Sequence, residues 1–449
     1  MRNLKTILVI LASILLFIGS TSAQNPIIRD QFTADPTARV FNGKVYLYPS
    51  HDIRAPESFA RKDWFCMEDY HVFSSSNLTD WTDHGVILSQ AKVNWVDATT
   101  FSMWAPDCIE RNGKYYFYFP ANIKASSGRG FGIGVAVAES PSGPFTPQPE
   151  PIKNVHGIDP VVFIDKDGQA YIYYSLNRIF AARLKDNMLE LASDPIVIGD
   201  FPKQGLVEGP FMFERKGIYY MTYPHVQNKI ERLEYAIADN PMGPFKVTGE
   251  IMDESPMGCW TNHHSIIEFN NQWYLFYHEN DLSPKFDKNR SVCVDSLFFN
   301  EDGTIRKVIP TNRGVGITSA LKNIEVDRYS NISPTGASVA FINSTNTFEG
   351  WKTVIINRNG WIKYNTVDFG STKLKSVQVR AISQTGGTLQ IRLDKADGTL
   401  FAEIKIPKGT SWNTVDSKML KYQKGIHNLV VMLKDNNPVE IDWIRFTNQ

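Results

Sequence analysis

The chain has 449 residues and carries 47 Lys and Arg against 47 Asp and Glu, so its formal net charge is zero. This balance gives no support to a nucleic-acid partner or an anionic membrane surface, both of which attract strongly basic proteins. The length exceeds what one ordinary hydrophobic core serves and suits two domains. Aromatic residues make up 12% of the chain, and aromatic residues favour strands.

The first 23 residues have the pattern of a secretory signal peptide. Arg2 and Lys5 form a positive start, an apolar run extends from Ile7 to Ile18, and small residues end at Ala23. The apolar run is about a dozen residues, short of the ~20 that a membrane-spanning helix needs. We therefore expect residues 1–23 to be removed, no membrane span, and a periplasmic or secreted protein.

A short phrase, a Gly- or Asn-centred turn followed by aromatic and β-branched residues, occurs five times. Asn-Gly and Asp-Gly between apolar runs are the strongest local hairpin signal, because a type I′ turn needs positive φ at both central residues. Each copy is therefore predicted to be the turn and second strand of a hairpin. Spacings of about 50 to 70 residues are typical of propeller blades, so residues 24–319 are predicted to form a five-bladed β-propeller. The copies are Asn42–Tyr48, Asn112–Tyr118, Asp167–Tyr173, Lys216–Thr222 and Asn271–Tyr277.

A polar or aromatic residue stands about one strand length before each of these turns. In a propeller the first strand of every blade lines the central channel, so these positions are expected to converge on one site. Asp35 and Asp159 each precede a proline, which favours extended conformations, so both carboxylates are predicted on extended strand ends. An insertion over residues 50–69 should lie above the channel mouth. The five positions are Asp35, Trp104, Asp159, Glu208 and His264.

Residues 320–449 have a different pattern. Apolar and polar residues alternate over 376–380, 388–393, 429–433 and 440–446, and Gly, Asn and Asp turns separate these runs. Alternation with a period of two and almost no helical periodicity indicates short strands. This part is therefore predicted to be a β-sandwich of the jelly-roll type, and the whole chain to be all-β.

Four cysteines, Cys66, Cys108, Cys259 and Cys293, are far apart and include no CxxC pair. An oxidising compartment permits disulfides, and four cysteines allow three pairings. Four isolated thiols in or near the blade cores fit the sequence equally well, so the pairing stays open.

Three carboxyl groups at equivalent positions of the repeated unit indicate hydrolysis of a glycosidic bond. That reaction needs one protonated acid at the leaving oxygen and one ionised carboxylate for water or the anomeric carbon. A third carboxylate can raise the pKa of the acid, because like charges resist joint ionisation. Arg290 and His264 would add positive charge and hydrogen bonds, and Trp104 a flat face for a sugar ring. His264 could equally be a structural hydrogen-bonding residue or hold a metal ion in the channel.

At these residues the chain resembles glycoside hydrolase family 43, a family of five-bladed propellers. The resemblance covers about residues 30–310 and implies an inverting mechanism. It implies Asp35 as general base, Glu208 as general acid and Asp159 as the residue that tunes and orients that acid. The carboxyl groups of an inverting pair stand ~6.5–9.5 Å apart, which leaves room for a water. The motifs are Ala34-Asp35-Pro36 with Ser50-His51-Asp52, Trp104-Ala105-Pro106-Asp107, Gly157-Ile158-Asp159-Pro160, Val207-Glu208-Gly209-Pro210, His263-His264-Ser265 and Arg290 to Asp295.

The same resemblance implies contacts to the substrate and a metal ion. His51, Asp52, Trp104, His264 and Arg290 are expected to bind the substrate. The chemistry itself needs no cofactor, but relatives often carry a calcium ion near the channel, which here points to His264.

The C-terminal part resembles carbohydrate-binding module family 6. Such modules usually hold a structural calcium ion, which here would fall on Asp327 and Asp442. Trp412 matches one of the two cleft aromatics, whereas Glu440 stands where many relatives have Asn. Sugar binding and a purely structural role both remain open for this domain. The matching stretches are Ile324–Ser330, Gly360–Tyr364, Val367–Gly370 and Glu440–Phe446.

Together the two resemblances imply a secreted exo-glycosidase that trims plant hemicellulose. The first expectation is α-L-arabinofuranosidase activity on arabinoxylan or arabinan. A β-1,4-xylosidase is the alternative, because arabinofuranose and xylopyranose present similar hydroxyl patterns. A β-galactofuranosidase and a non-catalytic carbohydrate-binding propeller are further alternatives. The expected partner is a polysaccharide or oligosaccharide, and the protein is expected to be a monomer.

Overall fold

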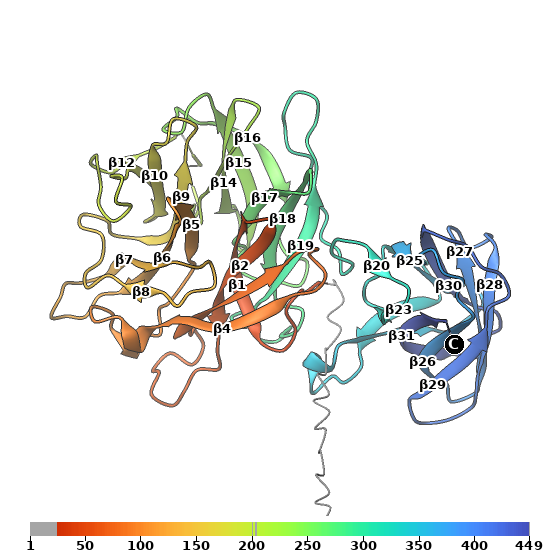
Figure 1. The fold of residues 1–449 in the computed structure, drawn as a ribbon. Coiled ribbons are helices and arrows are strands. Elements are labelled where there is room, and N and C mark those ends of the chain that lie inside the picture. The colour runs from red at the N-terminus through yellow and green to blue at the C-terminus, as the bar shows by residue number, and fades with distance from the viewer. Residues whose placement is uncertain (1–24, 200, 203, 449) are drawn as a thin grey trace, which may run out of the picture.

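The computed structural model describes residues 25–199, 201–202 and 204–448. The predicted signal peptide, residues 1–23, lies outside these ranges. Figure 1 shows two all-β parts beside one another, a propeller and a sandwich. Within the described ranges, no helix has the length and hydropathy that a membrane crossing requires.

The first part is a five-bladed propeller, which confirms the predicted fold. Each blade is an antiparallel sheet whose strands are in chain order. Blade one contains β1 (Phe32–Phe41), β2 (Lys44–Asp52), β3 (Asp69–Ser75) and β4 (Thr82–Ser89). Blade two contains β5 (Asp107–Arg111), β6 (Lys114–Asn122), β7 (Phe131–Ala138) and β8 (Thr146–Pro147). Blade three contains β9 (Ile158–Ile164), β10 (Ala170–Ser175), β11 (Ile179–Arg183) and β12 (Ile196–Val197). Blade four contains β13 (Phe211–Arg215), β14 (Ile218–Val226), β15 (Glu231–Ala238) and β16 (Lys246–Met252), and blade five contains β17 (Ser265–Phe269), β18 (Gln272–Glu279) and β19 (Ser291–Leu297). The short 3-10 helices η1 (Gln90–Lys92) and η2 (Ala98–Thr100) follow β4.

The repeated turns connect the first and second strands of the blades, as predicted. Asn42 and Gly43 have φ values of 49° and 74°, as a type I′ turn requires. In blade four Lys216 takes the Asn position with φ 53°. In blade five the two positive-φ residues are Asn270 and Asn271, so this turn begins one residue earlier than predicted.

In four of the five blades, the residue that closes the repeated phrase links neighbouring blades, whereas Tyr277 of blade five bonds to Asp295 of its own blade. In three blades it is a buried tyrosine whose hydroxyl donates to a backbone carbonyl of the next blade. In blade four the same position is Thr222, whose hydroxyl instead forms a 2.6 Å hydrogen bond with Nε2 of His264. The three tyrosine bonds run from Tyr48 to Pro141 (2.5 Å), from Tyr118 to Met188 (2.7 Å) and from Tyr173 to Pro241 (2.8 Å).

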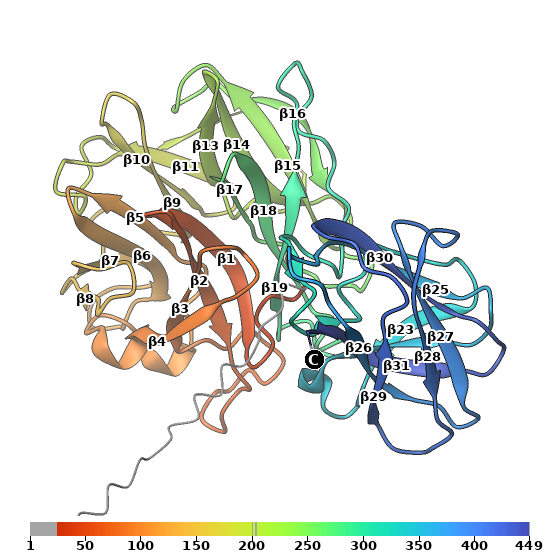
Figure 2. The same ribbon diagram turned by 45° about the vertical axis from the view of Figure 1, so that its right-hand side comes forward.

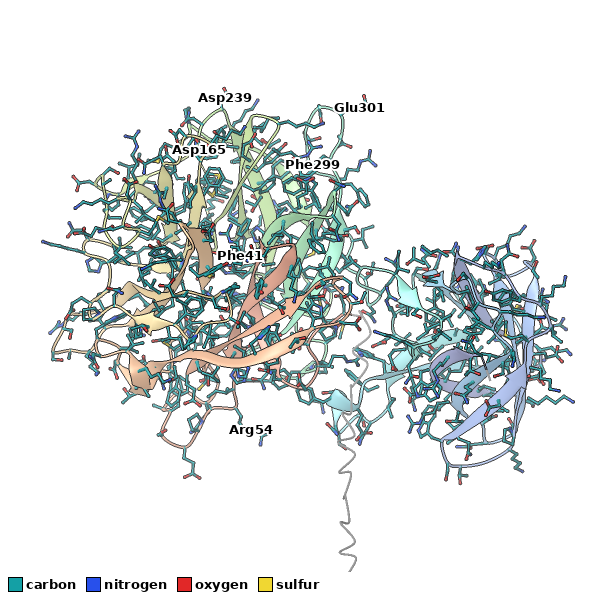
Figure 3. All side chains as sticks on the ribbon, viewed as in Figure 1. Phe41, Arg54, Asp165, Asp239, Phe299 and Glu301 are labelled. Carbon is teal, nitrogen blue, oxygen red and sulfur yellow. The ribbon has the colours of Figure 1, made fainter. Side chains whose placement is uncertain are left out.

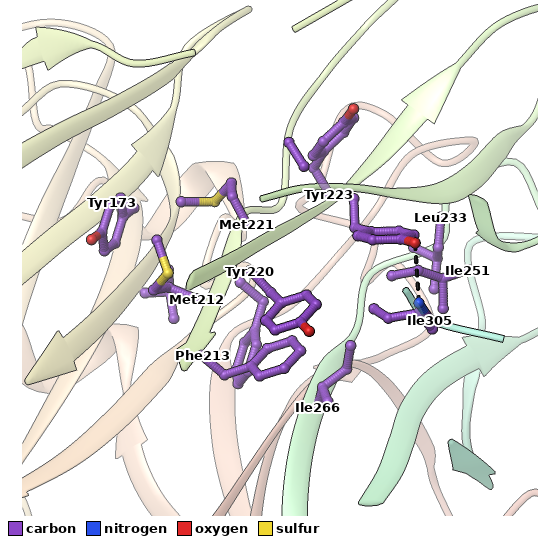
Figure 4. Close-up of a cluster of buried hydrophobic side chains, with 14 of the residues drawn as sticks. Tyr173, Met212, Phe213, Tyr220, Met221, Tyr223, Leu233, Ile251, Ile266 and Ile305 are labelled. Carbon is purple, nitrogen blue, oxygen red and sulfur yellow. Dashed lines mark hydrogen bonds between the residues drawn. The ribbon is translucent and has the colours of Figure 1, made fainter. Parts of the chain in front are cut away.

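The first strands form a ring around the propeller axis. β1 contacts β5, β5 contacts β9, β9 contacts β13, β13 contacts β17 and β17 contacts β1 (Figure 2). The hydrophobic core lies between adjacent blades, and Figure 4 shows the cluster shared by blades three, four and five. In this cluster Phe213 and Tyr220 stack at 4.7 Å, and the N–H of Ile305 donates to the Tyr235 hydroxyl at 3.0 Å.

The N-terminal segment of the described chain packs against the last blade, which has three strands. Ile27 N–H donates to the carbonyl of Val292 at 2.8 Å. The amide of Asn25 donates to the carbonyl of Val294 at 3.1 Å and accepts from its N–H at 2.7 Å. The start of the propeller therefore covers β19 and helps to hold blades one and five together.

The second part is a sandwich of two sheets, again as predicted. Its first strand, Thr318–Ser319, already pairs with the sandwich strand at residues 361–368, two residues before the predicted boundary at 320. One sheet contains β20 (Thr318–Ser319), β22 (Asn331–Ile332), β25 (Trp361–Asp368), β27 (Gly387–Leu393), β28 (Leu400–Ile406) and β30 (Ile426–Leu433). The other contains β21 (Ile324–Glu325), β23 (Ala337–Phe341), β24 (Trp351–Ile355), β26 (Ser376–Ile382), β29 (Asn413–Lys418) and β31 (Val439–Thr447), and η3 (Thr347–Glu349) lies between β23 and β24.

All four cysteines are buried free thiols. Of the two possibilities that the sequence leaves open, the structure has isolated thiols rather than disulfides.

The insertion after β2 projects from the side of the propeller opposite to the loops that contain Asp239 and Glu301. Figure 3 labels Arg54 in this insertion at the lower edge, whereas Asp239 and Glu301 lie at the upper edge. Asp35 stands near the beginning of β1, and the β1–β2 turn at Asn42 and Gly43 lies at the other end of that strand.

Candidate active site

A cavity of about 160 Å³ lies where the first strands of the blades begin. Its walls come from all five blades, and four of the five predicted positions line it: Asp35, Trp104, Asp159 and Glu208. The cavity also contains Arg290 and Glu231. Its volume corresponds to roughly five waters, the size of one monosaccharide unit rather than a chain.

Asp35 is fixed by Arg290, a residue of the last blade. The guanidinium donates to both carboxylate oxygens of Asp35, at 2.7 and 3.2 Å, and the Ser50 hydroxyl donates to Oδ2 at 2.6 Å. Burial alone would raise the pKa of Asp35, but Arg290 and two nearby histidines outweigh it and hold that pKa at about 2. Asp35 is therefore ionised at any ordinary pH.

Asp52 acts on Asp35 through the arginine. Its carboxylate accepts bonds from the backbone N–H, Nε and Nη2 of Arg290 at 2.8 to 2.9 Å. Asp52 is buried and is not part of the cavity wall. It orients the guanidinium rather than reaching the cavity itself.

The backbone at Asp35 and Asp159 differs from the prediction. Both residues have positive φ, 46° and 56°, and each lies at a register irregularity inside its strand. The prediction that the following proline keeps these carboxylates extended is wrong. Left-handed φ is costly for a residue other than glycine, and such strain gathers where the surroundings hold a side chain in a special direction. The N–H of Asp35 donates to Nδ1 of His278 at 3.1 Å, one of the bonds that hold this bulge.

Glu208 has the opposite protonation tendency to Asp35. Burial raises the pKa of Glu208 well above its usual value, and the carboxyl groups of Glu231 and Asp35 raise it further. Burial, then Glu208, likewise raises the pKa of Asp159, whose Oδ2 accepts the N–H of Gly209 at 3.1 Å. One carboxylate that stays ionised and one carboxylic acid that stays protonated are what an acid–base pair requires.

Glu231, at the beginning of β15, is a fourth carboxyl group that the sequence does not reveal. It is 1% exposed, and its Oε2 accepts the N–H of Asn262 at 2.6 Å. Burial raises its pKa to about 8, and its carboxyl group interacts with that of Glu208. Glu231 lies on the third strand of its blade, so no repeat position points to it.

The histidine that lines the cavity is not the one that was predicted. His263 lines the cavity, whereas its neighbour His264 is fully buried behind it and bonds to Thr222. His278 also lies beside the site, where it accepts from Asp35 through Nδ1 and bonds to Thr261 through Nε2. Burial lowers the pKa of His263 to about 4 and that of His278 to about 3, so both are neutral.

Aromatic rings line the mouth of the cavity. Trp64 and Phe65 come from the insertion, which is therefore part of the wall, as its predicted position implies. Phe65 stacks on Trp260 at 5.9 Å and meets Trp104 edge-on at 6.3 Å. Trp104 also packs against Phe131 at 4.8 Å. Only Trp104 among these rings is predicted from the sequence, because it stands at the repeated position before a hairpin turn and the others do not.

His51 is not brought into the cavity. Successive residues of a strand point to opposite faces, so His51 faces away from the site that its neighbour Asp52 supports. Its Nδ1 lies 2.7 Å from Asp69 on β3.

The residues named for calcium fit it poorly. The Asp327 carboxylate pairs with Arg29 at 2.6 Å and that of Asp442 with Arg380, so each faces an arginine rather than a shared cation. Near the channel, Nδ1 of His264 is buried without a partner among the described residues. A single histidine nitrogen does not make a calcium site, because calcium binds six to eight oxygen ligands.

Comparison with known proteins gives the same picture. The sequence profile "Glycosyl hydrolases family 43" matches residues 23–305, and "Carbohydrate binding module (family 6)" matches residues 332–448. "Xylosidase/arabinosidase 43A" of Humicola insolens is 38% identical over an alignment of 330 residues, which covers 62% of this chain and 98% of that protein. "Arabinoxylan arabinofuranohydrolase" of Paenibacillus polymyxa is 26% identical and covers 94% of this chain with 74% of its own length.

A solved structure matches the propeller. It is a GH43 beta-xylosidase/alpha-arabinofuranosidase from a compost microbial metagenome, in complex with xylotriose and in a calcium-free form. It is 37% identical with a TM-score of 0.57, and covers 64% of this chain and 98% of its own. The chain belongs to glycoside hydrolase family 43, an inverting family, and carries a family 6 carbohydrate-binding module after the catalytic propeller.

Proposed function

We propose that the protein is a secreted exo-glycosidase that removes single pentose units from arabinoxylan-type polysaccharides, with α-L-arabinofuranosidase activity first. The observation that carries this proposal is the cavity of about 160 Å³, which is lined by carboxyl groups of opposite protonation tendency and has room for one sugar. The pattern of residues 1–23 supports export.

In the proposed mechanism, ionised Asp35 takes a proton from the attacking water while protonated Glu208 gives its proton to the leaving oxygen. Arg290 holds both oxygens of Asp35, and Asp52 holds Arg290. Asp159 accepts the N–H of Gly209, the residue after Glu208, and through this bond would orient the acid. Trp104 and Phe65 would pack on the sugar faces.

β-1,4-Xylosidase activity is the second candidate. It is favoured by the relatives of more than 35% identity, whose names combine xylosidase with arabinosidase or arabinofuranosidase. Initial rates on nitrophenyl α-L-arabinofuranoside and nitrophenyl β-D-xyloside, with sugar analysis after digestion of arabinoxylan, arabinan and xylotriose, separate the two. Arabinose release from the polymers supports the first candidate. Xylose release from xylotriose alone moves the assignment to the second.

The catalytic assignment is tested with Glu208→Gln. We expect a loss of kcat of roughly 10²- to 10⁴-fold on arabinoxylan oligosaccharides, because the leaving oxygen no longer receives a proton. The loss should be smaller on nitrophenyl glycosides, whose leaving group needs little protonation. Glu268→Gln, on the exposed face of β17, is the matched control and should behave as wild type. Equal turnover by Glu208→Gln and Glu268→Gln would contradict the role of Glu208.

A further inference from the structure

A second cluster of potential ligands lies outside the active site, at the base of the insertion. It consists of His51 on β2 and of Asp69 and His71 on β3, which together flank residues 53–68. One candidate ligand atom from each residue lies within 4.8 Å of the others. The two imidazole rings meet edge-to-face at 4.9 Å, and all three residues are half-buried.

The hydrogen bonds of the two histidines leave one nitrogen of each available. Nδ1 of His51 lies 2.7 Å from Asp69, and Nδ1 of His71 lies 3.1 Å from both carboxylate oxygens of Asp83 on β4. No described residue forms a hydrogen bond with Nε2 of either ring. A carboxylate on one ring nitrogen fixes the tautomer and turns the lone pair of the other nitrogen outward, which is the usual arrangement of metal-bound histidines.

The donor set selects a class of metal. Two imidazoles with carboxylate oxygens suit zinc and its neighbours in the first transition row, whereas calcium and magnesium prefer oxygen alone. Zinc ligand atoms at ~2.0–2.2 Å from the metal stand about 3–3.5 Å apart, so closure from the present spacing needs side-chain shifts of about an ångström. His51 lies near the end of β2, Asp69 begins β3, and all three side chains are only half-buried, so these shifts are adjustments of partly exposed groups.

We propose that His51, His71 and Asp69 form a binding site for a zinc-class divalent cation, with Asp83 as supporting carboxylate. The site is separate from the catalytic cavity and from any ion in the channel. Its position gives it a consequence for the enzyme, because the cation would join the two ends of the insertion. That segment carries Trp64 and Phe65 into the cavity wall, so a bound ion would restrain the aromatic mouth of the active site. Closing a loop at its base lowers the entropy of its open forms.

The direct test is calorimetric titration of the full chain with Zn²⁺ after removal of metals by a chelator, with Ca²⁺ titrated in parallel. We expect one Zn²⁺ per chain with a dissociation constant in the micromolar range or below, and no comparable binding of Ca²⁺ at this site. His51→Ala and His71→Ala should each weaken Zn²⁺ binding at least tenfold. His427→Ala is the matched control, because His427 stands 3.5 Å from Asp394 but has no second imidazole beside it.

Asp69→Asn provides a second variant that preserves shape if a histidine variant fails to fold. Limited proteolysis tests the consequence: Zn²⁺ should slow cleavage within residues 53–68 at least threefold in the wild type and not in Asp69→Asn. No Zn²⁺ binding by the wild type, or binding that persists unchanged in His51→Ala and His71→Ala, would overturn the site. Binding without any change in cleavage would overturn the restraint of the insertion.

Discussion

At the scale of single residues, the site depends on how neighbouring carboxyl groups share protons. Glu231 faces Glu208 and, after burial, is the strongest influence that raises the pKa of Glu208. In Glu231→Gln the side-chain amide can donate to ionised Glu208, which favours the ionised form and lowers that pKa. We therefore expect the alkaline limb of the kcat/KM profile to move to lower pH by about one unit, while activity at pH 5 changes less than about threefold.

The pH profile separates this effect from a merely structural one, because a loosened site lowers the whole curve without moving its limb. An unshifted alkaline limb in Glu231→Gln would contradict the coupling.

The sequence predicts three of the four carboxyl groups, Asp35, Asp159 and Glu208, because they stand at equivalent positions of the repeated unit. It does not predict Glu231, whose relation to Glu208 exists only after β14 and β15 pair and the segment at Asn262 folds over them.

At the scale of elements, the strand ends that carry the acids depend on close backbone contacts. Gly209 has φ 51° and donates its N–H to Asp159. A Cβ at this position would stand 2.8 Å from Cγ of Pro224 and 3.1 Å from Nδ1 of His263. Gly209→Ala should therefore displace Glu208 and Asp159 and lower kcat by roughly ten- to a hundredfold, since misplacement by about 1 Å can cost that much.

Gly217→Ala is the control within the same hairpin. Gly217 has φ 85°, and a Cβ there would meet no atom within 4 Å. It carries the backbone strain without the clash, so we expect a loss of roughly 1–2 kcal/mol of stability and an unchanged kcat. Equal kcat in the two variants, measured with folded protein, would show that the close approach at Gly209 does not position the acids.

Hairpin turns and strand bulges differ in how well the sequence predicts them. The hairpin turns at Asn42 and Asn112 are local, and both central residues of each have the positive φ that the sequence predicts. At Asp167 the turn lies where it is predicted, but only Gly168 has positive φ, so the turn type there differs from the prediction. The bulges at Asp35 and Asp159 are not local. Their positive φ is held by partners far along the chain, such as His278 for Asp35 and Gly209 for Asp159, so the local rule for a residue before proline gave the wrong conformation.

At the scale of the whole molecule, the sandwich touches the two segments that lead into the active site. Phe348 packs against Phe32, three residues before Asp35, at 4.8 Å. The Thr347 hydroxyl donates at 2.6 Å to the carbonyl of Leu282, in the loop that ends at Arg290. The change of pattern near residue 320 predicts two domains, but these contacts join residues that no periodicity relates.

The ion pair between Arg29 and Asp327 gives the interface its most testable contact. Asp327 is 1% exposed and its partner reaches it from the propeller, so Arg29→Met leaves an unpaired charge in the interface, which costs roughly 3–5 kcal/mol. We expect the wild type to unfold in one calorimetric transition, and Arg29→Met to show two, with the sandwich melting several degrees earlier. The double variant Arg29→Met/Asp327→Leu removes both charges of the pair, so it should recover most of the loss and bring the two transitions together again.

Because the interface borders the segments that carry Asp35 and Arg290, Arg29→Met should also lower kcat on a small nitrophenyl glycoside that cannot reach the sandwich. A single transition at the wild-type temperature in Arg29→Met would mean that the two domains do not stabilise each other through this pair.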